Sequence, residues 1–180
     1  GSIRLTSGGA AYTTRFFADD AAAYAIFADG EDLVMRTLGE HTHCICGNSS
    51  CNEDGHGAAV TFATVLTQAL LEHNRYTLSD GTYYLNGTLS PVNKIEITGT
   101  VTICLNGRTI ESTAENQPVF EVVSGGKLTL TDCKSNTGTG KVTRAYNSHG
   151  GGVEVNGGEF NLYGGSITKN TADNGGGVYI

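Results

Sequence analysis

The apolar residues of this chain change their spacing near Asn74. After that residue, short runs alternate apolar and polar positions and end at Asp, Asn or Gly, as in residues 127–132 and 153–157. A period of two is typical of β-strands, because successive side chains point to opposite faces of a sheet. The second half of the chain is therefore predicted to consist of many short strands joined by tight turns.

Two earlier segments carry apolar residues at helical spacing. Residues 58–73 place Phe62, Val65, Leu70 and their apolar neighbours on one face, which predicts an amphipathic helix. We expect that helix to cover the N-terminal end of the strands that follow it. Residues 15–28 are rich in Ala and also fit a helix, although the run 24–27 fits a strand equally well.

Gly-containing segments repeat in the last third of the chain. Residues 150–155 recur as residues 175–180, and residues 125–130 resemble residues 157–162. Self-similarity at such a period indicates a solenoid, in which each strand pairs in parallel with its counterpart one turn away. The expected fold is mainly β, a right-handed parallel β-helix with an N-terminal helical or irregular cap. The residues expected to point into its core are Val153, Val155, Phe160, Leu162, Ile167, Val178 and Ile180.

Composition and charge narrow the range of partners. The chain holds 26 Gly and 2 Pro, and only 16% of its residues are charged, which suits short strands and tight turns. Its formal net charge is −7, and no cluster of Lys and Arg offers the basic surface that nucleic acids select. No run approaches the roughly 18 apolar residues of a transmembrane helix. Neither a nucleic-acid partner nor membrane insertion is expected.

Several motifs resemble a known group of proteins. Residues 157–180 resemble the Gly-rich β-helix repeats of large surface and secreted proteins of gut Firmicutes. Within them, residues 164–167 and the following Asn170 are similar to repeats of polymorphic outer-membrane and autotransporter-type proteins. Residues 104–107 and 130–133 resemble the first turns of the Firmicutes repeats. The resemblance implies a secreted or cell-surface location and an adhesin-like role.

The predicted organisation has four parts. Residues 1–40 match no group and have no assigned role, and residues 41–56 form a Cys/His cluster. Residues 57–100 are expected to supply the capping helix and the first strands. Residues 101–180 are expected to form the β-helix, which either belongs to a longer array or pairs its open end with another molecule.

The Cys/His cluster carries the main chemical signal of the sequence. The candidate ligands are His43, Cys46, Cys51 and His56. Two thiolates and two imidazoles at these short intervals suit a tetrahedral, structural zinc ion, with no open position for catalysis. His41 and Cys44 repeat the His-x2-Cys spacing in a shifted register. The resemblance to surface proteins implies the same four ligands.

Disulfide bonds are the competing interpretation of the cysteines. In an oxidising compartment Cys51 can pair with Cys46 or with Cys44. Cys104 and Cys133 lie in apolar strands, so they are expected to pack in the core, with a bond between successive turns as the alternative.

The expected function is structural or binding, with no catalytic and no cofactor-binding residues assigned. The chain is expected to be a surface-exposed or secreted adhesin-like module that binds a carbohydrate or a host surface protein, or itself through its open end. The alternative is a carbohydrate-active enzyme that uses Asp132, Glu154 or Glu159. Acids clustered with an Arg or Lys on one strand face favour the enzyme, and ladders of Thr and Asn favour the scaffold.

Overall fold

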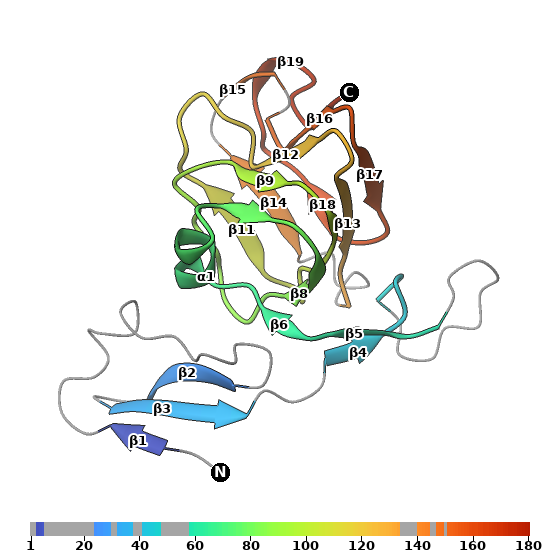
Figure 1. The fold of residues 1–180 in the computed structure, drawn as a ribbon. Helices are drawn as coiled ribbons and strands as arrows, with labels where there is room; N and C mark the ends of the chain where they lie inside the picture. The colour runs from blue at the N-terminus through green and yellow to red at the C-terminus, as the bar shows by residue number, and fades with distance from the viewer. Residues whose placement is uncertain are drawn as a thin grey trace.

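The computed structural model describes residues 3–5, 24–29, 32–37, 41–47, 58–133, 140–144, 147–149 and 151–180. The first three strands form a small antiparallel sheet in the order β1-β3-β2. These strands are β1 (Ile3–Leu5), β2 (Tyr24–Asp29) and β3 (Asp32–Thr37). Figure 1 shows this sheet in blue, beside the rest of the chain.

The helix predicted over residues 15–28 is wrong where the structure describes it. Residues 24–28 belong to β2, and residues 15–23 lie outside the described residues. In β2, Ile26 is opposite Met35 and Phe27 is opposite Val34 of β3. Aromatic and β-branched residues favour such cross-strand pairs over a helix, in which they lose side-chain freedom. The strand interpretation of residues 24–27 is therefore correct.

Most described strands lie in three parallel sheets (Figure 1). The first parallel sheet contains, in spatial order, β17 (Glu159–Leu162), β13 (Lys127–Thr131), β10 (Thr100–Cys104), β8 (Gly81–Tyr84) and β6 (Thr64–Val65). The second contains β20 (Val178–Tyr179), β16 (Val153–Asn156), β12 (Phe120–Val123), β9 (Ile95–Ile97) and β7 (Thr77–Leu78). The third contains β11 (Thr109–Ser112), β14 (Lys141–Arg144) and β18 (Ser166–Ile167).

Two pairs of strands complete the described sheets. Parallel strands β15 (Asn147–His149) and β19 (Ala172–Asn174) form one pair. Antiparallel strands β4 (His41–His43) and β5 (Val60–Phe62) form the other, which we call the β4–β5 pair. Figure 1 shows the β4–β5 pair below the parallel sheets and to the right of the small N-terminal sheet.

The prediction of a single right-handed β-helix with a helical cap is wrong. The described strands form several separate short sheets of two to five strands, and two of these sheets are antiparallel. The helix expected over residues 58–73 is reduced to α1 (Gln68–His73), because β5 and β6 occupy its first half. Val60, Phe62 and Val65 are residue types that pack well in sheets, and they pair there with β4 and β8.

The short helix α1 begins after an N-cap residue, Thr67. The Thr67 side chain accepts a hydrogen bond from the Leu70 backbone N–H at 3.1 Å, which satisfies one of the free donors of the first turn. Leu71 is fully buried in the main core. In the described part of the chain, no helix has the length and hydropathy needed to cross a membrane.

The three parallel sheets share one apolar core. Along each strand, alternate side chains enter it, so Val101 and Ile103 of β10 are buried beside Leu128 and Leu130 of β13. The intervening side chains point away from the core. For β10 this alternation places Cys104 on the outer face of the first parallel sheet, in a separate apolar cluster with Phe62, Val65 and Tyr84.

Not all residues expected in the core are buried. Val153 and Val155 are buried, and Phe160, Ile167 and Val178 are partly buried against the core. Leu162 and Ile180, however, are 46% and 90% exposed. Leu162 is the last residue of β17 and Ile180 directly follows β20, and no described strand continues either sheet beyond these two strands.

Candidate metal centre

The β4–β5 pair places two imidazoles on one face. His41 is opposite Phe62 and His43 is opposite Val60 in the antiparallel register. Because side chains alternate along a strand, the sequence His-Thr-His sends both imidazoles to the same side and Thr42 to the other. Thr42 is exposed, whereas His43 is only 4% exposed. The pair therefore presents both rings to the first parallel sheet.

Two neighbouring strands of that sheet supply the sulfur atoms. Cys104 is the last residue of β10 and lies opposite Thr131, the last residue of β13, and Cys133 follows two residues later. Parallel pairing thus brings both cysteines to the same end of adjacent strands. The chain turns directly after Cys104 through Asn106 and Gly107, which have φ values of 50° and 69°. Asn and Gly tolerate this left-handed conformation better than other residues.

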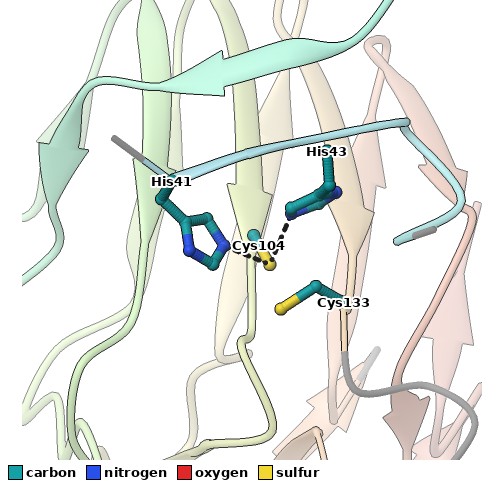
Figure 2. Close-up of side chains that lie close together, drawn as sticks. All are labelled: His41, His43, Cys104 and Cys133. Carbon is teal, nitrogen blue, oxygen red and sulfur yellow. Dashed lines mark hydrogen bonds between the residues drawn. The ribbon is translucent and has the colours of Figure 1, made fainter. Parts of the chain in front are cut away.

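The four side chains converge on one point, as Figure 2 shows. The Cys104 Sγ atom lies 3.3 Å from His41 Nε2 and 3.2 Å from His43 Nε2. With Cys133 Sγ included, all four donor atoms lie within 4.8 Å of one another. Zinc–sulfur and zinc–nitrogen bonds of about 2.3 and 2.0 Å imply donor separations of about 3.3 to 3.8 Å in a tetrahedron. The cluster is therefore close to the size that a metal ion requires.

The imidazole of His43 is oriented for binding at Nε2. Its Nδ1 lies 2.6 Å from the carbonyl oxygen of Cys44. A carbonyl oxygen only accepts hydrogen bonds, so Nδ1 carries the proton and donates it, which leaves a lone pair on Nε2. Metal-binding histidines commonly have such a partner on their second nitrogen.

Aromatic neighbours hold both imidazoles in place. The His43 ring stacks on Phe62, with ring centroids 4.5 Å apart and planes 23° from parallel. The His41 ring stacks on Tyr84 at 4.6 Å and 10°. Phe62 comes from β5 and Tyr84 from β8, so the rings are held between the β4–β5 pair and the first parallel sheet. The donors are therefore positioned by packing before any ion binds.

Burial has the largest effect on the pKa of Cys104. It removes the thiolate from water and raises the pKa of this thiol to about 12. Backbone N–H groups of Cys133 and Asn106 donate to the sulfur and act in the opposite direction. A divalent cation would supply the positive charge that the buried thiolate lacks, and its binding would displace the thiol proton.

Asp132 supports the geometry around the two cysteines. Its side chain is fully buried, and Oδ1 accepts a hydrogen bond from the Gly107 backbone N–H at 2.7 Å. Oδ2 accepts from the Gly140 N–H at 3.0 Å. This carboxylate was one of the acids considered for catalysis, but its hydrogen bonds tie together the backbone near the sulfur atoms.

The segment after His43 also packs against the cysteine strands. Thr131 donates a hydrogen bond through its hydroxyl to the Ile45 carbonyl. Gly47 has φ of 83°, and a Cβ atom there would lie 2.2 Å from the Asp132 carbonyl oxygen. Glycine is therefore required at position 47, because both the backbone angle and the close approach exclude a larger residue.

The structure describes two of the four predicted ligands, His43 and Cys46. His43 belongs to the cluster, whereas Cys51 and His56 lie outside the described residues, and Cys46 is partly exposed and is not one of the four clustered side chains. The set predicted from residues 41–56 therefore stays a prediction. His41, considered only in a shifted register, is in the cluster.

Sequence reasoning missed the sulfur donors. The expected packing in an apolar core is confirmed for Cys104, which is buried, and Cys133 packs against the same cluster, but the sequence did not place either thiol beside the histidines. The available signals were the Asn-Gly turn after Cys104 and the similar position of Cys133 at the end of a strand. These signals indicate that two strands end side by side with a cysteine each. They do not indicate that residues 41–43 lie over those strand ends.

The other predicted acids lie away from this cluster. Glu154 is opposite Glu121, which in turn is opposite Glu96, so three glutamates follow one another across the second parallel sheet. Lys94 forms an ion pair with Glu121. Glu159 is exposed and lies 2.8 Å from Lys127, and this ion pair lowers the pKa of Glu159. We call Glu96, Glu121 and Glu154 the glutamate column.

Comparisons with known protein families, with curated proteins and with solved structures found no significant match to this chain.

Proposed function

We propose that this chain is a structural and binding module of a secreted or cell-surface protein, stabilised by one zinc ion. The ion is held by His41, His43, Cys104 and Cys133. The observation that carries the proposal is the convergence of these four donor atoms within 4.8 Å. The chain's ligand, on the resemblance of its Gly-rich segments to adhesin-like proteins, is a carbohydrate or a host surface protein.

The donor set supports zinc over other biological metals. Two sulfur and two imidazole donors suit zinc, whereas calcium and magnesium prefer oxygen ligands. Four protein ligands fill a tetrahedral shell and leave no position for water or substrate. The zinc ion therefore acts as a cross-link and does not catalyse a reaction.

The cross-link joins parts of the chain that otherwise share a small contact. His43 and Cys104 are 61 residues apart in sequence. Beneath them, the apolar cluster on the outer face of the first parallel sheet consists of Phe62, Val65, Tyr84 and Cys104, with Val60 and Cys133 at its margin. A core of this size gives limited stabilisation, and structural zinc sites commonly contribute much of the folding energy of such small units.

A polar ladder supports a scaffold role. Thr82, Thr102, Thr129 and Asn161 are paired in register on the outer face of the first parallel sheet. Uncharged side chains of similar size stack without repulsion between strands. This is the pattern expected of a structural module.

The glutamate column favours a second candidate, a carbohydrate-active enzyme. Neighbouring strands are about 4.8 Å apart, and the two carboxylates of retaining glycosidases are about 5 to 5.5 Å apart. Release of reducing ends or unsaturated sugars from polysaccharides, abolished by Glu121→Gln, would support that candidate. Unchanged polysaccharide after prolonged incubation would leave the scaffold as the function.

The metal proposal is tested by elemental analysis of the full chain purified without added metal. We expect about one zinc per chain, because a tetrahedral site of four protein ligands holds one ion. Cys133→Ser and His41→Ala should each lower the zinc content, whereas Cys51→Ser and His56→Ala should leave it unchanged. This comparison separates the cluster from the ligand set predicted over residues 41–56.

A spectroscopic measurement identifies directly which cysteines bind the metal. Cobalt(II) bound to thiolates gives charge-transfer absorption, which should weaken in Cys104→Ser and Cys133→Ser and persist in Cys46→Ser. Zinc lost on changing Cys51 or His56, but retained on changing Cys133, would overturn the proposed site.

A further inference from the structure

We propose that Cys104 and Cys133 form an oxidation site, at which a hydroperoxide converts the two sulfurs to a disulfide and releases the bound metal. The proposal rests on the zinc site described above and adds a regulated state to it. The sulfur chemistry and the metal content are measured separately, so the two proposals can fail independently.

The two sulfur atoms are close enough for this reaction. Both cysteines are free, and their Sγ atoms lie within the 4.8 Å span of the cluster. The Cys133 backbone N–H also donates to the Cys104 sulfur, so the backbone at Cys133 lies beside the other side chain. A disulfide requires sulfur atoms about 2.05 Å apart, so the reaction has to bring the two Sγ atoms closer together than they are in this structure.

Exposure determines which sulfur reacts first. Cys104 is fully buried at the end of β10, whereas Cys133 is partly exposed. The Cys133 Sγ contacts the Asn106 side-chain oxygen at 3.3 Å, at the turn that follows Cys104. An oxidant that approaches from solvent therefore meets Cys133, and Cys104 lies behind it as the second thiol.

The reaction is balanced with a hydroperoxide as the oxidant. The Cys133 thiolate attacks one peroxide oxygen, the O–O bond breaks, and a sulfenic acid and hydroxide (or alkoxide) form. The Cys104 thiolate then attacks the sulfenic sulfur, the S–S bond forms, and a second hydroxide leaves. Two electrons pass from the two sulfurs to the peroxide. Zinc loses both thiolate ligands and keeps only His41 and His43.

Oxidation of other cysteines would give products that compete with the Cys104–Cys133 disulfide. Cys46 is partly exposed, and Cys44 is buried beside His43. Oxidation of Cys46, alone or with another thiol, would consume peroxide without touching the proposed pair. The identity of the linked peptides therefore decides the proposal.

The test treats the zinc-loaded full chain with hydrogen peroxide and follows zinc release with a chromogenic chelator. Remaining thiols are then blocked with an alkylating agent, and disulfide-linked peptides are identified by mass spectrometry. We expect one zinc released per disulfide, a Cys104–Cys133 cross-link with the loss of two hydrogens, and recovery of zinc binding after reduction. Cys46→Ser is the matched control and should behave like the unmodified sequence.

Two results would overturn the proposal. One is zinc retained with the Cys104 and Cys133 thiols still free after Cys46 has been oxidised. The other is a disulfide that joins different cysteines. If the protein binds no zinc before oxidation, the proposed zinc site fails, and the peptide map of the metal-free chain still shows whether Cys104 and Cys133 form the disulfide.

Discussion

Asp132 lies fully buried between the turn that follows Cys104 and the start of β14. Its two carboxylate oxygens accept hydrogen bonds from the backbone N–H groups of Gly107 and Gly140. Donors left without a partner in a buried position lose their hydration and gain nothing in return. At the scale of single residues, this side chain determines the backbone path around the sulfur donors.

We therefore expect Asp132→Asn to lower the free energy of unfolding by about 1–3 kcal/mol, the cost of an unsatisfied buried donor. The amide nitrogen of Asn would face one of the two N–H groups and could not accept from it. Urea unfolding of the metal-free chain measures the change. Glu159→Gln removes an exposed carboxylate whose ion pair with Lys127 is open to solvent, and it should change the unfolding midpoint much less. Equal midpoints for the two variants would contradict this role of Asp132.

At the scale of elements, the glutamate column places like charges on three successive strands. Glu121 is opposite both Glu96 and Glu154, an arrangement that destabilises a sheet unless a cation compensates it. Lys94 provides that cation through its ion pair with Glu121. The hydrogen bond to Glu121 raises the pKa of Lys94, burial acts in the opposite direction, and the charges of Glu121, Glu96 and Glu154 add to the increase.

The raised pKa sets the pH range of this contribution. A lysine with a higher pKa in the folded state stabilises the protein below its unfolded pKa, near 10.5, and loses that effect as the pH rises through the folded value. Lys94→Met should lower stability by at most about 1 kcal/mol, because the side chain is partly exposed to solvent.

Denaturation of Lys94→Met across pH 7 to about 11.5 checks this prediction, and the range spans the unfolded pKa of lysine. We expect a constant difference from the unmodified sequence up to about pH 10 and a smaller one above it. Lys127→Met is the control, because its partner Glu159 is more exposed than Glu121. A difference that grows above pH 10 would show that Lys94 does not act through its charge.

At the scale of the whole molecule, exposed apolar side chains gather at one edge of the parallel sheets. Five large apolar residues are exposed in the described part of the chain: Val92, Leu162, Tyr163, Tyr179 and Ile180. All except Val92 lie in or directly after β17 and β20, the last strands of their sheets. An edge strand also presents unpaired backbone groups. Both features favour association with a second copy of the chain.

We expect the purified chain to associate as its concentration rises, since pairing would cover these side chains and backbone groups. Sedimentation velocity over a range of concentrations measures this. The double change Leu162→Ser with Ile180→Ser should weaken the association, and Val92→Ser should not, because Val92 contacts Tyr76 beside β7, at the opposite edge of the second parallel sheet from β20. A single monomeric species for the unmodified chain at every concentration would contradict the prediction.

Local patterns predicted much of the secondary structure correctly. The alternation in residues 127–132 and 153–157 predicted strands, and β13 and β16 are there. The repeat that aligns residues 150–155 with 175–180 also matches the observed pairing of Val153 with Val178. These features depend on side-chain alternation and on Gly turns, which act over a few residues.

The local pattern did not predict the secondary structure of segments that suit both a helix and a strand. Residues 58–66 have helical spacing, but they form β5 and β6 because β4 and β8 offer partner strands. Residues 24–28 likewise form β2 beside β3. In both cases a partner strand supplies backbone pairing that outweighs a weak helical preference, and β5 and β6 find their partners about 20 residues away along the chain.

The sequence by itself determined that the chain is mainly β, that its turns lie at Gly and Asn, and that its His and Cys residues suit a metal. The tertiary structure decided which of those residues meet. His41 and His43 share one face through local alternation, but Cys104 and Cys133 reach them only because adjacent parallel strands end together beneath the β4–β5 pair. Spacing along the chain describes neighbours within a few residues, whereas a metal site depends on distances in space that packing creates.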